Sequence, residues 1–353
     1  MDIYVLNLAL ETLGIIDQYQ SCIWTSRYYS TGDFELYLGA TTEALNLLQK
    51  NRILARDMDM TETEMHNLMV IQNIELKTDA ENGNTITVTG SSLGAIIGQR
   101  VVIFQSILRG QVNVCISRLL FENIIEPENT ERQIPNFIID SSPEITDTME
   151  MQITGDNLAE AISEICHTYE LGWELYIKNN NFAFRLYKGI DRSYEQTENP
   201  FVVFSTDFDN LISSDYSDNI TDYKNVAIVA GEGQGNARKL QVVGTASGLN
   251  RYEVWVDARD VSSNDGEIQL TDYTTLLQEQ GQEALAGLDV VQAFEGETDT
   301  TVNYILNQDF FLGDIVQIEN DYGIGATARI LEIIDTDDDT GRTVIPTFST
   351  MEL

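Results

Sequence analysis

SRYYSTGDFELYLGA, residues 26–40, places apolar and aromatic side chains on both sides of the turn residues Thr31-Gly32-Asp33. Alternation of apolar and polar residues is typical of β-strands, and glycine can take the positive φ that a tight turn needs. The stretch therefore predicts a β-hairpin. In its second strand, we expect Glu35 and Tyr37 to face solvent or a neighbouring chain. The inward face of that strand is expected to carry Phe34, Leu36 and Leu38.

The same alternation recurs along most of the chain. Residues 2–90 are mostly strand-like, and short strands such as YEVWVDA return after residue 175 without regular β-α-β alternation. Helical spacing is confined to a few segments, which are 42–49, 104–119, 158–169 and 273–288. The expected N-caps of three of these helices are Thr42, Asp156 and Thr271. The pattern predicts an α+β, mainly β fold and argues against a doubly wound parallel sheet.

The chain is strongly acidic, with 57 Asp and Glu against 20 Lys and Arg and a formal net charge of −37. Such a field repels nucleic acid and anionic lipid, so a DNA-reading role is not expected. The three cysteines, Cys22, Cys115 and Cys166, are far apart and suit a reducing cytosol. Neither the Met1-Asp2 start nor the apolar run 93–108 has the pattern of a signal peptide or a membrane span.

The sharpest enzyme-like motif is Gly90-Ser91-Ser92-Leu93-Gly94, a Gly-x-Ser-x-Gly that follows a predicted strand. In a serine hydrolase this spacing exposes the middle serine on a tight turn, with a histidine as base. Only His66 and His167 exist, so Ser92 would need His167, which lies inside a predicted helix. The simpler interpretation, which we prefer, is that a serine caps a short helix and the glycines ease the turn.

Two loops resemble ligand sites without matching them. Gly231–Gly235 follows a strand, but its third glycine comes one residue early and strand-like residues follow, so a hairpin loop is expected. Asp335–Gly341 has the aspartate spacing of a calcium loop, but Thr340 and Pro346 stand where glycine and glutamate are needed, so a solvated turn is expected. We predict no catalytic, cofactor-binding or metal-binding residue and no cofactor.

Five segments occur in one order and carry a family resemblance. They are SRYYSTGDFELYL, FENIIEPENTERQIPNF, GIDRSYEQTENPFVVFSTDFDNL, KNVAIVAGEGQGNARKLQVVG and GLNRYEVWVDARD. Together, over about residues 20 to 330, they resemble the tail-associated hub proteins of long-tailed bacteriophages, which also occur in phage-derived tail particles. The resemblance implies a structural protein of the tail tip or baseplate.

The resemblance also implies a domain order. Two barrels that imitate the tail-tube subunit are expected, with a helical α+β region inserted. Residues 1–100 would form the first barrel, completed by strands in 205–245. Residues 101–204 would be the inserted region, and residues 246–353 the second barrel region.

By the same resemblance, the chain forms a homotrimeric ring at the distal end of the virion tail and is assembled in the host bacterial cytoplasm. Its expected partners are the tail tube, distal tail or baseplate proteins, and tip, spike or fibre proteins. Acidic residues around a lumen would let DNA pass without sticking, because like charges repel phosphate. In the strand YEVWVDA, Glu253 and Asp257 form a polar row that is expected to answer positive residues across an interface with a neighbouring subunit. Arg251 and Arg259 flank that strand and are candidate ion-pair partners.

Two other functions stay open at this stage. One is a serine esterase using Ser92 and His167. The other is a glycan- or receptor-binding tail module, in which Trp24, Tyr28 and Tyr29 would stack on sugar faces. The chain ends at Leu353 soon after its last predicted strands, so an appended hydrolase domain is not expected.

Overall fold

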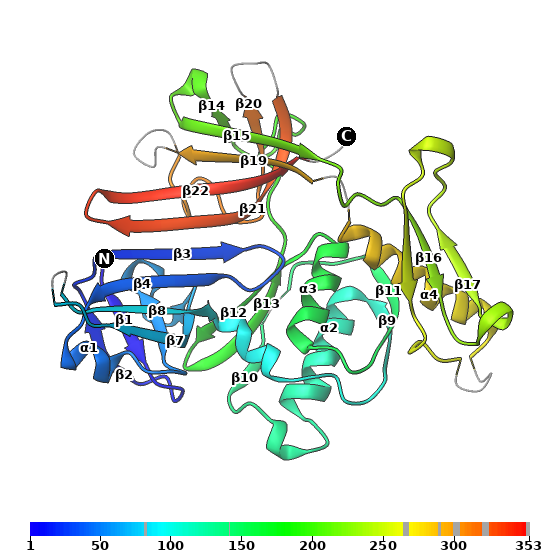
Figure 1. The fold of residues 1–353 in the computed structure, drawn as a ribbon, viewed down its shortest axis with the longest axis horizontal. Helices are drawn as coiled ribbons and strands as arrows, with labels where there is room; N and C mark the ends of the chain where they lie inside the picture. Colours follow the sequence, from blue (N-terminus) through cyan, green and yellow to red (C-terminus); the bar gives the residue numbers. More distant parts are fainter. Residues whose placement is uncertain are drawn as a thin grey trace.

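A computed structural model defines the fold, which is mainly β with four α-helices among the described residues (Figure 1). The residues that it describes are 1–80, 83–140, 142–263, 268–288, 291–298, 304–319 and 325–350. Four separate hydrophobic clusters form its interior. The predicted α+β, mainly β class is confirmed.

One 13-stranded sheet joins the beginning and the end of the chain. Eleven strands lie along its path, in the spatial order β15 (Leu211–Asn219), β19 (Val291–Thr298), β22 (Gly341–Thr350), β21 (Gly325–Asp338), β3 (Ser21–Arg27), β4 (Asp33–Gly39), β8 (Thr85–Ser92), β7 (Met69–Lys77), β5 (Ile53–Arg56), β1 (Ile3–Leu6) and β2 (Thr12–Ile16). Off this path, β20 (Ile315–Glu319) pairs with β21 and with β14 (Val203–Ser205). Among the described residues the path is open, with β2 and β15 at its ends, so two closed barrels are not formed by this pairing.

The opening hairpin is confirmed as the antiparallel pair β3 and β4. Its inward face carries Phe34, Leu36 and Leu38, each at most 2% exposed, while Glu35 is exposed and Tyr37 is half-buried. A glycine is required at position 32, but for a different reason from the expected positive φ. Gly32 does not have a positive φ, but a methyl group on it would overlap the Thr25 carbonyl oxygen, so the close approach of two backbones requires the glycine.

A central region packs against the long sheet and contains the largest hydrophobic cluster. It contains a four-stranded sheet of β10 (Phe137–Ile139), β13 (Asn181–Tyr187), β12 (Gly172–Lys178) and β6 (Glu64–Met65). It also contains the hairpin-like pair β9 (Ser106–Gln111) and β11 (Thr148–Ile153), and the helices α2 (Val112–Leu120) and α3 (Leu158–Thr168). The predicted helix at 104–119 is half wrong, because residues 106–111 pair as a strand before the helix begins.

A small module, residues 226–286, lies at one end of the molecule (Figure 1). Its three-stranded sheet has the order β17 (Leu240–Val243), β16 (Val226–Ala230) and β18 (Glu253–Asp257), and α4 (Leu270–Ala286) covers one face. The predicted last helix is confirmed. Its N-cap is Gln269 and not Thr271.

The remaining short elements include α1 (Thr42–Leu47), where the prediction of a helix at 42–49 is confirmed. The caps of two other helices lie one residue from those expected: Thr41 caps α1, and Asn157 caps α3 by accepting hydrogen bonds from the Ala159 and Glu160 amides. The 3₁₀ turns span Asp57–Asp59, Leu93–Gln99, Thr130–Arg132, Thr206–Phe208, Gly235–Ala237 and Gly248–Asn250, and a π turn spans Phe121–Ile125.

The expected partner of the first β unit is wrong. Strands from 205–245 do not pair with it: β15 pairs with β19, and β16 and β17 belong to the module sheet. The strand that extends the first unit is β21, which pairs with β3. Local alternation identifies a strand but carries no information about its partner, because period two is the same beside any neighbour. The domain boundaries at 100, 204 and 245 stay a prediction.

Two glycines of the opening hairpin provide a matched test of close backbone approach. We expect Gly32→Ala to lower the free energy of unfolding by about 1–3 kcal/mol, because the new methyl group overlaps backbone. Gly39→Ala is the control, since nothing lies within 4 Å of the added carbon. Urea unfolding followed by circular dichroism measures both. Equal stability of the two variants would contradict the explanation.

Candidate functional site

The contact that organises the fold is the seam between β3 and β21, where segments near the two ends of the chain meet (Figure 1). The antiparallel register runs from Glu332 opposite Arg27 to Asp338 opposite Ser21. At the first of these positions, Arg27 donates to Glu332 at 2.6 Å directly across the seam. Without this pairing, the long sheet would be two separate sheets.

A buried ion network crosses the same seam. The guanidinium of Arg56 bonds Asp59 and Asp335 at 2.6 Å each, and all three side chains are at most 5% exposed. Arg342, on β22, adds a second bond to Asp335 at 2.8 Å. Arg56 also lies over the ring of Trp24, with its guanidinium carbon 5.0 Å from the ring centroid. The network therefore ties strand β5 of the first unit to strands β21 and β22 of the second.

The charge of Asp335 depends on these two arginines. Burial alone would raise the pKa of the Asp335 carboxyl, but the hydrogen bonds and charges of Arg342 and Arg56 outweigh it and hold the pKa below its usual value. A buried carboxylate that has lost its cation has a large desolvation cost. Loss of either arginine is therefore expected to destabilise the seam.

Tyr28, from the opening stretch, lies where three parts of the chain meet. It is fully buried, and methyl groups on Gly172 of the central region or on Gly313 before β20 would overlap its ring. Its hydroxyl donates to the Glu170 carbonyl oxygen at 3.2 Å and accepts from the Gly189 amide at 3.2 Å. The loop after β3 therefore positions the central region as well as the seam.

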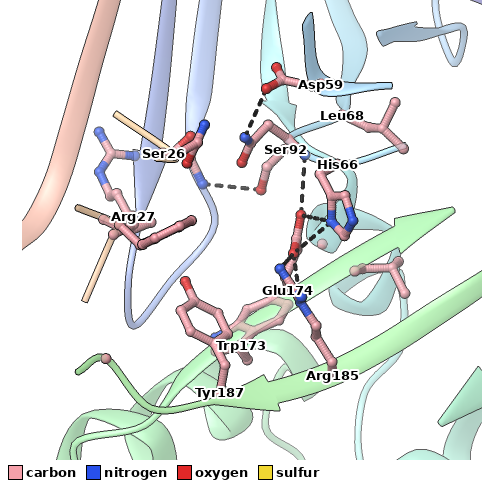
Figure 2. Close-up of a pocket in the computed structure, with 18 of the residues that line it drawn as sticks. Ser26, Arg27, Asp59, His66, Leu68, Ser92, Trp173, Glu174, Arg185 and Tyr187 are labelled. Atoms are coloured by element: carbon pink, nitrogen blue, oxygen red, sulfur yellow. Dashed lines mark hydrogen bonds and ion pairs between the residues drawn. The ribbon is translucent and has the colours of Figure 1, made fainter. Parts of the chain in front are cut away.

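A cavity of about 660 Å³ lies beside this meeting point (Figure 2). Glu174 is its polar centre: the carboxylate accepts from Arg185 at 2.9 Å and from the Asn67 amide at 3.1 Å, and lies 3.2 Å from Nδ1 of His66. The ring of His66 stacks on Tyr176 with centroids 4.5 Å apart. This part of the cavity wall therefore consists of paired charges.

The protonation of this wall follows from its pairing. Burial would raise the pKa of Glu174, but the hydrogen bond of His66 and the charge of Arg185 lower it to about 2. Burial opposes a charge on His66 in the same way, yet the hydrogen bond and charge of Glu174 raise its pKa above the ordinary 6.5. The pair favours ionised Glu174 beside protonated His66.

The structure does not bring Ser92 and His167 together at this cavity. Ser92 lines it, whereas His167 is on α3 with its ring edge-on to Tyr29 at 4.7 Å. The backbone of Ser92 is extended, with φ −57° and ψ 161°, so the strained turn of a nucleophile elbow is not present. The Ser92 hydroxyl instead accepts from the Gly32 amide at 3.1 Å, and the Ser92 amide donates to the Gly32 carbonyl oxygen at 2.9 Å.

The glycines of the motif also have packing explanations. A methyl group on Gly90 would overlap the Val70 carbonyl oxygen, and one on Gly94 would lie 2.7 Å from the Trp173 ring. Ser92 occupies the N-cap position of the 3₁₀ turn, as expected, but its side chain makes no capping bond there. The motif is therefore explained by the contact between the hairpin and the central region.

The two ligand-like loops have structural roles. Gly231–Gly235 joins β16 to β17, as the predicted hairpin loop. Asp335–Gly341 spans the end of β21 and the turn to β22, but Asp335 is buried in the seam network, so the prediction of a solvated turn is wrong for that residue. Across the described ranges, no cluster of three His, Cys, Asp or Glu side chains is arranged to hold a metal ion.

Of the three aromatic residues proposed for sugar stacking, Tyr29 is half-buried, and the other two, Trp24 and Tyr28, do not reach the surface. Trp24 and Tyr28 are 1% and 0% exposed, and the Trp24 indole donates to the Asn67 carbonyl oxygen at 2.7 Å. A large aromatic ring contributes most to stability when it is buried, and both of these rings lie in the interior of the protein. The expectation of glycan stacking by these two residues is therefore wrong. No helix among the described residues is long and apolar enough to span a membrane.

The fold is that of phage tail proteins. It is similar to the 43 kDa tail protein of prophage MuSo2 from Shewanella oneidensis, at 11% identity and a TM-score of 0.60, covering 99% of this chain and 98% of that one. The tail protein from Neisseria meningitidis MC58 is similar at 12% identity and a TM-score of 0.57, with 99% and 95% covered. Prophage tail protein gp18 from Listeria monocytogenes EGD-e is similar at 12% identity and a TM-score of 0.53, and the match covers 99% of this chain and 94% of that one.

Residues 2–349 match the siphovirus ReqiPepy6 Gp37-like protein family, and the chain belongs to that family. No curated protein matches the sequence. The predicted resemblance to tail-associated proteins of long-tailed phages is confirmed.

Arg56 provides a direct test of the seam. Arg56→Met leaves Asp59 without its bonded cation and removes one of the two cations on Asp335, so we expect the free energy of unfolding to fall by about 3–5 kcal/mol. The control is Arg259→Met, which removes an ion pair whose arginine is 69% exposed and should change the stability far less, because solvent screens an exposed pair. Guanidinium unfolding measures both. A loss at Arg56 no larger than at Arg259 would contradict the role of the network.

The His66 pair predicts a defined pH dependence. Because the folded pKa of His66 is raised, its contribution to stability is fully present below about pH 6.5 and is lost as the pH rises through the folded value. We expect the stability difference between wild type and His66→Gln to be largest near pH 5.5 and to shrink towards pH 9. Chemical denaturation at a series of pH values measures the difference, and NMR titration of His66 locates its pKa. A constant difference across this range would refute the pairing.

Proposed function

We propose that the chain is a structural hub protein at the distal end of a phage or phage-like tail. In this role it forms a ring, a homotrimer, that joins the tail tube to the tip or baseplate. Its partners are the tail tube, distal tail or baseplate proteins, and tip, spike or fibre proteins. It acts in the virion tail and is assembled in the host bacterial cytoplasm.

The observation that carries this proposal is the β3–β21 seam. It joins two β units, each with its own hydrophobic cluster, into one continuous sheet. A wall segment that is two units wide is suited to a ring that faces a tube, since three copies would present six units to a sixfold tube and a threefold surface to the tip. The buried ion network keeps the two units in a fixed relation.

A role in assembly requires no catalysis, and this agrees with the way the cavity is built. Its polar centre, Glu174, is paired with Arg185 and His66, and Ser92 is bonded to the hairpin loop. We therefore propose a non-enzymatic protein without a cofactor. The acidic composition suits a lumen that DNA can traverse, because carboxylates repel phosphate and prevent adhesion.

Native mass spectrometry of the purified chain tests the ring. We expect a stable species at three times the 39.7 kDa chain mass over a range of concentrations. Negative-stain images of that species should show a closed ring with a central opening. A different closed stoichiometry would contradict the trimer, and a chain that stays monomeric alone and with its tube and tip partners would contradict the hub.

A further inference from the structure

The cavity beside Glu174 lies where three parts of the chain meet. Its walls come from the opening hairpin and residues 58–69 of the first unit, from β12 and β13 of the central region, and from residues 307–314, which lead into β20. Protein interiors leave few voids larger than a water molecule, whereas this space of about 660 Å³ has the size of a ligand-binding cavity. The cavity is therefore large enough to admit part of a partner molecule.

Apolar side chains form both the interior and the opening of the cavity. Leu68 and Trp173 line it and are buried. Met58, Ile190 and Phe311 also line it but are 44%, 43% and 40% exposed, so they lie at the opening. A small molecule that the cavity encloses needs no apolar surface outside it, whereas a peptide segment that enters it continues across the opening. The exposed apolar rim therefore favours a peptide.

The polar row of β18 shows how this acidic chain uses its basic side chains. Arg251 and Glu253 pair at 2.6 Å, and Asp257 bonds both Arg238 and Arg259. The expectation that Glu253 and Asp257 answer positive residues of a neighbour is thus not supported by this arrangement. A basic side chain that is free to bind a partner must lie elsewhere.

One such side chain lies in the wall of the cavity. Six charged residues of the lining form ion pairs with other side chains, and they are Arg27, Asp59, His66, Glu174, Arg185 and Asp314. Lys188 is the seventh charged residue, and it is exposed and has no ion-pair partner among the residues that the structure describes. Within the described part of the lining, the one unpaired charge is therefore positive.

Hydroxyl groups add further donors to the same wall. Figure 2 shows the Tyr187 hydroxyl pointing toward the opening hairpin, and this hydroxyl makes no hydrogen bond within the described ranges. Ser26 and Ser30 line the hairpin side of the cavity, and their hydroxyls likewise have no partner in the part of the chain that the structure describes. A hydroxyl can donate one hydrogen bond, so these groups can serve a ligand that accepts.

We propose that the cavity binds a peptide segment of another tail protein, in which an apolar side chain lies next to a carboxylate. The apolar side chain fills the cavity, and Lys188 and Tyr187 hold the carboxylate, which accepts a charge-assisted hydrogen bond from the ammonium group. Charge complementarity selects this chemistry, because a lining with an unpaired cation favours an anionic partner. The inference rests on the proposed hub function, since it assigns a binding place and a chemistry to one of the hub's partners.

Two capped tetrapeptides, Gly-Phe-Glu-Gly and Gly-Phe-Gln-Gly, test the proposal by isothermal titration of the full chain. At about 0.15 M salt, which screens the net negative charge of the chain, we expect the glutamate peptide to bind about fivefold more tightly than the glutamine peptide. Lys188→Gln should remove this preference and leave the affinity for the glutamine peptide unchanged. Lys50→Gln is the matched control, since Lys50 is also exposed, lies outside the lining and makes no ion pair with a described residue. It should bind both peptides like wild type.

The methyl signals of methionine locate the bound peptide. Met58, Met60 and Met69 line the cavity, whereas Met149 and Met151 are buried on β11 and do not line it. In protein labelled with carbon-13 at the methionine methyl groups, we expect the glutamate peptide to shift the first three signals and to leave the other two in place. Binding that shifts none of the three signals from the lining would overturn the inference.

The other outcomes separate this inference from the hub proposal. Equal affinity for the two peptides, or a preference that survives Lys188→Gln, means that the carboxylate is not recognised and overturns the inference. Phenylpropionate that binds as tightly as the glutamate peptide overturns it too, because a free carboxylate then suffices. A chain that forms rings but binds neither peptide refutes the inference and leaves the hub proposal intact. A chain that binds the glutamate peptide in the cavity but never forms a ring, alone or with its partners, does the reverse.

Discussion

The pairing of β3 with β21 is the constraint on which the rest of the structure depends. It joins residues near the two ends of the chain, and the buried Arg56–Asp335 pair fixes the strands around it. Two charges in a protein interior are costly unless each keeps its partner, so the network contributes a fixed arrangement more than it contributes net stability. The hub role that we propose needs such a fixed arrangement, because forces on one unit must reach the other.

Much of the local structure could be predicted from the sequence. The inward face of the opening hairpin, the helix at 158–168 and the turn at Gly231–Gly235 all follow from period and turn chemistry. The partner of β3 could not be predicted, since alternation is identical whether the neighbour comes from 205–245 or from 325–338. The helix predicted at 104–119 is partly wrong for a similar reason. Leu108 and Val112 fit both the helical and the strand period, and only the pairing of β9 with β11 decides between a helix and a strand there.

The site was harder to predict than the fold. The aspartate spacing suggested Asp335 as a possible calcium ligand, yet the cations that pair with it are Arg56 and Arg342. Arg56 is 279 residues away in the sequence. Arg56 closes an apolar strand and carries no motif, so no local signal could reveal that it is buried and paired. The Gly-x-Ser-x-Gly motif misleads for a related reason, because glycines required by a close approach to Val70 and Trp173 have the same spacing as those of an enzyme.

The seam also affects the order in which the protein can be made. Arg27 and Glu332 are 305 residues apart, so β3 leaves the ribosome long before its partner exists. During that interval the first unit presents an unpaired strand edge, and such an edge is a template for pairing with other nascent chains. Contacts of high sequence separation also form slowly. Each nascent chain is therefore open to misassembly at this edge until β21, near the end of the sequence, has been synthesised.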